Sequence, residues 1–202
     1  MSRNGRGSRG AEEPRSIPAP QLPSTPAPKH TLVLGLGNPI LGDDGVGWRV
    51  VEQAQELIRN GDTSRQQDEA TEVVTTNVEF DCFALGGLAL MERLIGFDRA
   101  ILVDAIQTRG GDPGAIYRLT LDDLPTLHAN STHDASLKAA LTLGRQLGAR
   151  LPEEIVIYAI EAAKVLDFGE SLSPPIAASV ARAAEMVLDE LADSKWQMAD
   201  GR

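Results

Sequence analysis

The sequence predicts a single three-layer α/β/α sandwich with a mostly parallel, twisted sheet, and three observations lead to this fold class. Short, wholly apolar runs alternate along the chain with longer segments of helical periodicity. Strands that are apolar throughout are typical of parallel sheets, because helices cover both faces of such sheets. The chain has 202 residues, of which 42% are hydrophobic, so it can bury the core of one domain of this class.

The expected elements follow one another from residue 31. Strands are predicted where apolar or β-branched runs occur, at residues 31–35, 72–80, 100–106, 115–120 and 155–160. Apolar side chains with helical spacing predict helices over residues 45–59, 86–95, 135–147 and 176–193. Ser173 and the proline pair after it predict the start of the last helix, because serine caps helices and proline fits a first turn.

Charge and composition divide the chain into one domain and two tails. The net charge is −10, yet residues 1–29 carry five basic against two acidic side chains and hold six of the twelve prolines. They offer almost no large apolar side chain, so burial cannot offset the entropy of ordering them. We therefore expect a disordered tail at residues 1–29, a single domain at 30–193 and a short tail at 194–202.

The composition also argues against several classes of protein. An acidic chain with an isoelectric point near 4.8 is a poor match for the phosphate backbone of nucleic acid. Cys82 is the single cysteine, which excludes an internal disulfide and a cysteine-rich metal site, and its apolar neighbours predict a buried structural thiol. The apolar runs are too short to span a membrane. We expect a monomeric cytoplasmic protein that binds neither nucleic acid nor membranes.

The densest cluster of chemistry-bearing residues is segment 35–47, Gly-Leu-Gly-Asn-Pro-Ile-Leu-Gly-Asp-Asp-Gly-Val-Gly. It follows the first predicted strand, as a dinucleotide-binding turn would, but Ile40 replaces the third glycine of that motif. Asp43 and Asp44 would also repel a pyrophosphate. Either aspartate could cap the next helix, which accounts for one carboxylate and leaves the other and the glycines unexplained. We expect Asp44 to be functional and replacement of Asp43 to matter less.

Asp104 and His133 extend this cluster. Asp104 lies within or at the carboxyl end of an apolar strand, where an unpaired carboxylate is costly and where parallel sheets bind ligands. His133 stands in a polar loop that opens the next helix. Amide hydrogen bonds to Asp104 and helix capping by His133 are the structural alternatives. If the first and third strands are neighbours, Asp44 and Asp104 share a sheet edge, and two carboxylates with one imidazole suit a divalent transition metal.

These residues together resemble the hydrogenase maturation proteases, over residues 31–193. The resemblance rests on the glycine loop with Asp44, the Leu-Val-Asp-Ala run that contains Asp104, and His133 before a helix. It implies an endopeptidase that removes the C-terminal extension of a nickel-loaded [NiFe]-hydrogenase large-subunit precursor, with Asp44, Asp104 and His133 as catalytic and nickel-binding residues. It also implies that the nickel is carried by the precursor rather than held permanently by this chain.

Two departures from the family pattern bear on the substrate. Some members have glutamate where this chain has Asp44, a side chain shorter by one methylene. Many members read Asp-x-Gly-Thr-x-Gly where residues 81–87 of this chain lack the threonine. Because that segment borders the expected site, the choice of substrate stays open.

Two other functions remain possible at this point. Gly-Leu-Gly-Asn-Pro also opens the peptidyl-tRNA hydrolases, but these need a catalytic histidine beside an asparagine and a basic face for the tRNA. The other possibility is a non-enzymatic module that uses the acidic edge for metal-dependent docking to a metalloenzyme precursor. A protease would shorten a nickel-loaded precursor, whereas a docking module would only form a complex with it.

Overall fold

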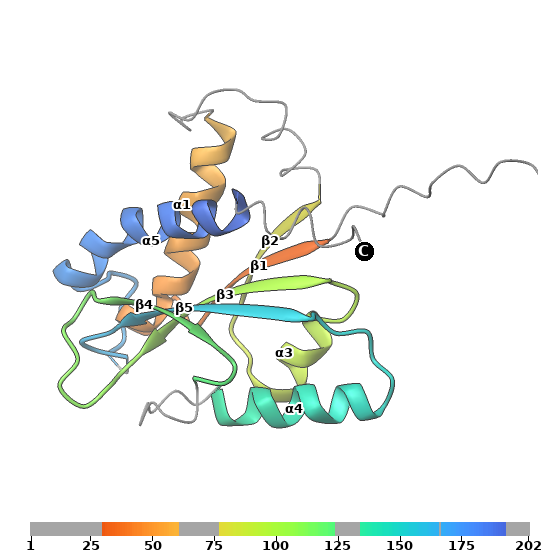
Figure 1. The fold of residues 1–202 in the computed structure, drawn as a ribbon. Coiled ribbons are helices and arrows are strands. Elements are labelled where there is room, and N and C mark those ends of the chain that lie inside the picture. The colour runs from red at the N-terminus through yellow and green to blue at the C-terminus, as the bar shows by residue number, and fades with distance from the viewer. Residues whose placement is uncertain (1–29, 61–76, 124–133, 166, 193–202) are drawn as a thin grey trace, which may run out of the picture.

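The computed structural model describes residues 30–60, 77–123, 134–165 and 167–192. Both predicted tails and His133 lie outside these ranges, so the domain boundaries stay predictions. The described residues form one sheet with helices on both of its faces (Figure 1).

The sheet has five strands in the spatial order β2-β1-β3-β5-β4. In chain order they are β1 (Thr31–Leu36), β2 (Val78–Phe83), β3 (Arg99–Ile106), β4 (Ile116–Thr120) and β5 (Glu154–Glu161). Neighbouring strands are parallel, except that β4 pairs with β5 in antiparallel fashion at one edge. The predicted mostly parallel sheet is therefore confirmed, and the first and third strands are neighbours, which is the condition for Asp44 and Asp104 to share an edge.

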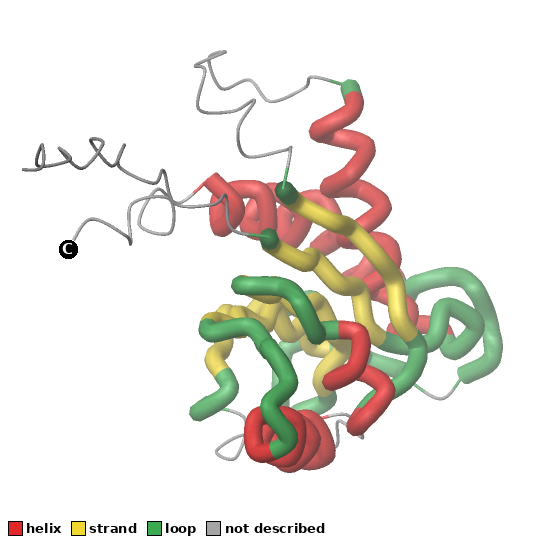
Figure 2. Tube along the Cα trace, turned by 90° about the vertical axis from the view of Figure 1, so that its right-hand side faces the viewer, coloured by secondary structure: helices red, strands yellow, loops and turns green. Residues whose placement is uncertain are grey.

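Helices on both faces complete the predicted sandwich (Figure 2). One face is covered by α1 (Val46–Arg59) and α5 (Pro174–Ala192), and a short 3₁₀ turn, η1 (Gly42–Gly45), precedes α1. The other face is covered by α3 (Gly87–Arg93) and α4 (Asp134–Gln146). Each layer buries its own apolar cluster against the sheet.

The central strand β3 shows how the two clusters arise. All of its residues are buried, and successive side chains point to opposite faces. Ile101 and Val103 pack on the side of α1 and α5, whereas Ala100 and Leu102 pack on the side of α3 and α4. The same alternation assigns Asp104 to the face covered by α3 and α4.

Element boundaries lie within two residues of the sequence prediction except at β2, and a short turn that was not predicted precedes α1. Strand β2 extends to Phe83, three residues beyond the predicted end, and the predicted residues 72–76 lie outside the described part of the chain. The helix expected from residue 45 is preceded by η1, in which Gly42 adopts a positive φ of 58°. That left-handed conformation is easily adopted only by glycine, and it turns the chain into α1.

A network of charged side chains joins α5 to the end of the sheet where the parallel strands begin. Arg99, the first residue of β3, is 3% exposed and donates to the Glu190 carboxylate of α5 at 2.5 Å. Arg99 also pairs with Glu154 at 3.1 Å, while Arg118 and the Tyr158 hydroxyl donate to Glu190 at 2.7 and 2.8 Å. These bonds give the buried guanidinium of Arg99 and the buried carboxylate of Glu190 charged partners, without which each would destabilise the fold.

Candidate functional site

Asp44 and Asp104 are brought to one edge of the sheet, as the sequence predicts. Strands β1 and β3 are parallel neighbours, and Gly35 lies opposite Val103 in their register. The loop after β1 and the last residues of β3 therefore share the edge formed by the strand carboxyl ends. In open parallel sheets this edge is where ligands bind.

A glycine lets helix α1 begin directly on these strand ends. A β-carbon at Gly47 would lie 2.3 Å from the carbonyl oxygen of Val103 and 2.5 Å from that of Leu36. Because both contacts are to backbone atoms, only glycine allows the first turn of α1 to approach so closely. This approach places η1, which carries Asp44, beside the strand that carries Asp104.

The loop between β1 and α1 is folded tightly on itself. Gly37 has a φ of 105°, and a β-carbon there would lie 1.9 Å from the carbonyl oxygen of Asp44. A β-carbon at Gly35 would lie 2.5 Å from the carbonyl oxygen of Gly47. These close contacts with backbone atoms explain why residues 35 and 37 are glycine, which helix capping by an aspartate does not explain.

The carboxylate of Asp44 lies inside this loop. Its Oδ2 accepts the backbone N–H of Asn38 at 2.7 Å. Among the described residues, neither η1 nor α1 has a side-chain hydrogen bond at its N-terminal cap, where Leu41 and Gly45 stand. The capping alternative is therefore wrong for Asp44, whose carboxylate closes the loop at the sheet edge instead.

Asp104 is buried near the end of β3. It is 5% exposed, and its Oδ1 accepts the backbone N–H of Ala105 at 2.9 Å. The side chain belongs to the face covered by α3 and α4. The sequence predicted a carboxylate buried in the sheet here, because Asp104 is the single charged residue in the apolar run 100–106.

Asp43 has a structural environment that the sequence did not indicate. It is 1% exposed, and its carboxylate accepts four hydrogen bonds from the segment between β5 and α5. The donors are the backbone N–H groups of Ala163 (3.1 Å), Lys164 (2.9 Å) and Ser173 (2.6 Å) and the Ser173 hydroxyl (2.9 Å). Asp43 thus does not cap α1, and the hydroxyl predicted to cap α5 donates to Asp43.

Glu161 is a second carboxylate that sequence reasoning missed. It ends β5, is 3% exposed, and accepts the N–H and the hydroxyl of Thr108 at 2.6 and 2.8 Å. It pairs in register with Ile106, two residues beyond Asp104 on the neighbouring strand, so it faces the same side of the sheet. The signal was an acidic residue directly after the apolar run 155–160, which is the pattern that singled out Asp104.

A cleft opens beside these strand ends. Its volume is about 930 Å³, and it lies between the segment after β3 and the end of β5. Its lining residues are Gln107, Thr108, Arg109, Gly111, Pro113, Glu161, Ala162 and Ala163. The cleft is large enough for a ligand of moderate size or a short peptide segment.

The third predicted site residue, His133, lies outside the described residues. Helix α4 begins directly after it, at Asp134, and ends at Gln146 before β5 starts. The start of α4 therefore lies toward the carboxyl edge of the strands (Figure 1). Among the described residues no group of three or more His, Cys, Asp or Glu side chains could hold a metal ion, so the three-residue metal site stays a prediction.

Cys82 in β2 is a poor nucleophile. The side chain is half-buried and packs against the apolar cluster under α1 and α5. Burial, together with the nearby carboxylates of Glu52 and Asp81, raises the pKa of the thiol to about 11. The thiol is protonated near neutral pH, in agreement with the structural role predicted for it.

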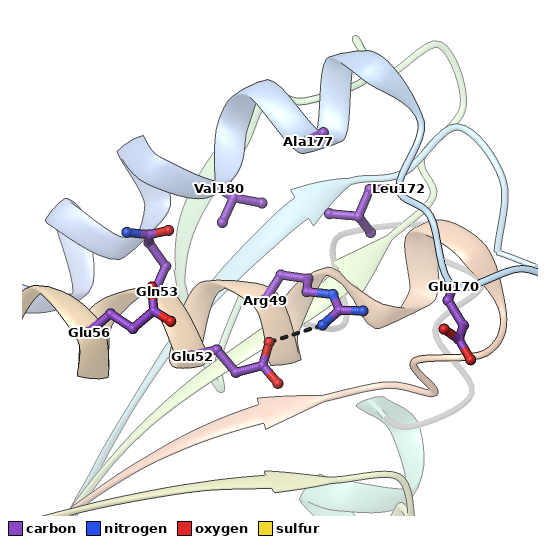
Figure 3. A pocket seen from close by; sticks show the side chains of 8 residues that line it. All are labelled: Arg49, Glu52, Gln53, Glu56, Glu170, Leu172, Ala177 and Val180. Carbon is purple, nitrogen blue, oxygen red and sulfur yellow. Dashed lines mark hydrogen bonds and ion pairs between the residues drawn. The ribbon is translucent and has the colours of Figure 1, made fainter.

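A second cleft, of about 340 Å³, lies between α1 and α5 (Figure 3). Arg49 and Glu52, one turn apart on α1, form an ion pair at 3.1 Å on its α1 side, and Glu170 also lines the cleft. This cleft is on the opposite face of the sheet from Asp104, so it is separate from the candidate site.

Within the described ranges no helix is long and apolar enough to cross a membrane.

Comparison with known proteins identifies the family. The hydrogenase maturation protease profile matches residues 84–190, more than half of the chain. The hydrogenase expression/formation protein HupD of Thiocapsa roseopersicina is 29% identical over 164 residues, which cover 80% of this chain and 67% of that protein. The hydrogenase 2 maturation protease of Escherichia coli is 27% identical over 165 residues, which cover 81% of this chain and 91% of that one.

Solved structures agree with this result. The hydrogenase maturating endopeptidase HybD from Escherichia coli superposes with a TM-score of 0.64 at 26% identity, over 82% of this chain and 93% of that chain. The [NiFe] hydrogenase maturation protease HybD from Thermococcus kodakarensis shares the fold, with a TM-score of 0.54 at 24% identity, over 81% and 99% of the two chains. The protein is a peptidase rather than a docking module or a peptidyl-tRNA hydrolase, and the chain belongs to the hydrogenase maturation protease family.

Proposed function

We propose that this peptidase removes the C-terminal extension of a nickel-loaded [NiFe]-hydrogenase large-subunit precursor in the cytoplasm. The observation that carries the proposal is the meeting of the Asp44 loop and the Asp104 strand at one edge of the sheet. Two carboxylates at such an edge suit a divalent metal ion, and the similar HybD from Thermococcus kodakarensis is a [NiFe] hydrogenase maturation protease. The nickel ion belongs to the substrate in this proposal.

Asp44, Asp104 and His133 contact the nickel of the bound precursor. Two oxygen ligands and one nitrogen ligand leave the coordination sphere of nickel incomplete, so the precursor supplies the remaining ligands. This contact fixes the precursor relative to the protease, and correct placement of a scissile bond lowers the barrier to its cleavage. An unloaded precursor lacks the contact and is not placed for cleavage.

The reaction itself is hydrolysis of one peptide bond. Water adds to the carbonyl carbon, the carbon–nitrogen bond breaks, and the leaving amine takes up a proton. The cleft of about 930 Å³ beside Glu161 supports the proposal, because the peptide next to the scissile bond needs a groove at this edge. Thr108 and Glu161 form part of the wall that the peptide contacts.

Mass spectrometry of a co-expressed large subunit tests the function. With this protein and with nickel in the medium, we expect a product shortened at its C-terminus, and the mass difference identifies the bond cleaved. Without nickel, or with Asp104→Asn in place of the wild type, we expect the full-length precursor. Equal cleavage with and without nickel would contradict recognition of the metal, and no cleavage by the wild type would contradict the substrate.

A further inference from the structure

Two segments far apart in the sequence run side by side at the candidate site. The loop of residues 40–43 pairs with the segment between β5 and α5 through backbone bonds. Gly42 N–H donates to Gly169 at 2.7 Å, Gly169 N–H donates to Ile40 at 3.0 Å, and Asp43 N–H donates to Lys164 at 3.1 Å. The four bonds to the Asp43 carboxylate join the same two segments, so both segments meet at this side chain.

The Asp43 site requires a carboxylate. Oδ1 accepts the N–H of Ser173, and Oδ2 accepts the N–H groups of Ala163 and Lys164 together with the Ser173 hydroxyl. Both oxygens therefore face backbone donors. An asparagine has one oxygen and one NH₂ group, so in either orientation its NH₂ group would meet at least one N–H that needs an acceptor.

Asp43 is coupled to Asp44 through the short turn η1. The two residues are adjacent, and the Asp44 N–H donates to Leu41 at 3.3 Å within the segment that Asp43 holds. On its other side, the Asp44 carboxylate accepts the N–H of Asn38. A shift of the turn at Asp43 therefore moves the Asp44 carboxylate relative to Asn38 and to β3.

We infer that Asp43 is a positioning residue for the candidate site, which holds the turn that carries Asp44 against the segment after β5. The inference rests on the proposed role of Asp44 in the reaction. It departs from the expectation from sequence that replacement of Asp43 has only a minor effect, because it predicts a large loss of turnover for Asp43→Asn as well as for Asp44→Asn. Asp43 also fixes Ala163, which lines the cleft beside Glu161, so one buried side chain positions both a candidate nickel ligand and part of the cleft wall.

Asp43→Asn tests the inference with two readouts. The first is amide hydrogen exchange at Asn38, whose N–H is held by the Asp44 carboxylate and makes no bond to Asp43. We expect faster exchange at Ala163, Lys164 and Ser173, and also at Asn38. The second is processing of the nickel-loaded precursor, where we expect the turnover at saturating precursor to fall by about 10- to 100-fold.

Asp98→Asn is the matched control. Asp98 also holds a loop, through the N–H of His30 at 2.9 Å and the guanidinium of Arg150, but at the opposite end of the strands. It should lower the melting temperature and leave both Asn38 exchange and processing unchanged. Ser173→Ala removes one of the four donors to Asp43, and it should give smaller changes of the same kind if Asp43→Asn fails to fold.

The outcomes separate this inference from the proposed function. Unchanged exchange at Asn38 in the folded Asp43→Asn or Ser173→Ala variant would overturn the inference, because Asp43 would then hold only its own contacts. Wild-type turnover by the folded Asp43→Asn variant would also overturn it. If the wild-type protein leaves the precursor intact, the proposed function fails, and the exchange measurement still decides whether Asp43 positions Asp44.

Discussion

Gly47→Ala should damage both the stability and the activity of the protein. The added β-carbon would lie 2.3 and 2.5 Å from two backbone oxygens, whereas an ordinary contact begins at 3.4 Å. The start of α1 must therefore move away from the strand ends by about 1 Å. Neither oxygen can yield, because Val103 and Leu36 belong to buried strands of the sheet.

The magnitude follows from that displacement. Overpacking of this kind costs about 3 kcal/mol, which lowers the melting temperature of a domain of this size by roughly 10 °C. A displacement of about 1 Å at a reacting site reduces turnover by roughly 100-fold. Thermal unfolding followed by circular dichroism measures the first effect, and precursor processing below the melting temperature measures the second.

Gly144→Ala in α4 provides the comparison. A β-carbon there would lie 2.9 Å from Leu151 Cδ1 and 2.9 Å from Met91 Sδ, which are the ends of flexible side chains. These atoms can move, and alanine favours the helix by up to about 1 kcal/mol, so we expect little net change in stability. If Gly47→Ala melts and processes precursor like the wild type, α1 does not rest on the strand ends as described.

Four further measurements follow from the site and the fold. Three single variants should each fold and lose most precursor processing: Asp44→Asn, Asp104→Asn and His133→Ala. When these substitutions are combined, the losses should be less than additive, because the three residues act on one metal ion. A folded Asp44→Asn variant with normal processing would remove this residue from the site. The hydrogen bond from Arg118 lowers the pKa of Glu190 in the folded protein. The ionised Glu190 side chain should therefore stabilise the fold fully above its pKa in the unfolded chain, and this stabilisation should be lost as the pH falls through its lower pKa in the folded protein. Glu190→Gln should lower the free energy of unfolding by about 3 kcal/mol in urea at pH 7 and make that free energy less dependent on pH in the acid range. An unchanged dependence on acid pH would contradict the pairing of Glu190 with Arg99 and Arg118. Cys82 should react slowly with iodoacetamide at pH 7 and faster toward pH 11, and Cys82→Ser should process precursor normally, whereas rapid labelling at pH 7 would mean that the thiol is less buried than described. Deletion of residues 1–29 should leave the melting temperature and processing close to wild type, and a large drop in either would show that this segment contacts the domain.

The sequence was most informative where burial alone decides the structure. The run around residues 100–106 is apolar throughout, and it forms the central strand with helices on both sides. Asp104 stood out because a charge interrupts that run. The adjacency of β1 and β3 needed an assumption at the sequence level, because hydrophobic patterns give the elements but not their order in the sheet.

The direction of β4 follows from the length of the connection that precedes it. Only residues 107–115 connect β3 to β4, which is shorter than a parallel crossover requires. Strand β4 must therefore begin at the edge where β3 ends and run back, which makes it antiparallel to β5. Gly110 and Gly114 in this connection both have a positive φ, as a tight change of chain direction favours.

The role of Asp43 could not be predicted from local sequence. Its partners Ala163 and Ser173 lie 120 and 130 residues further along the chain, and no short-range motif connects them. Asp43 and Asp44 look alike in the sequence, yet one is bonded across the fold and the other within its own loop. Glu161 could have been predicted in the same way as Asp104, because each is an acidic residue within or at the carboxyl end of an apolar strand.

The place of Glu190 in the chain has a consequence for biosynthesis. Arg99 at the start of the central strand finds this buried partner only on the last helix, 91 residues later. While α5 is still inside the ribosome, the Arg99 guanidinium lacks the Glu190 carboxylate and the face of the sheet that α5 shares with α1 is only partly covered. The domain therefore completes its folding only after α5 has left the ribosome, and translation products that stop before α5 are expected to be recognised as unfolded and degraded rather than to act as proteases.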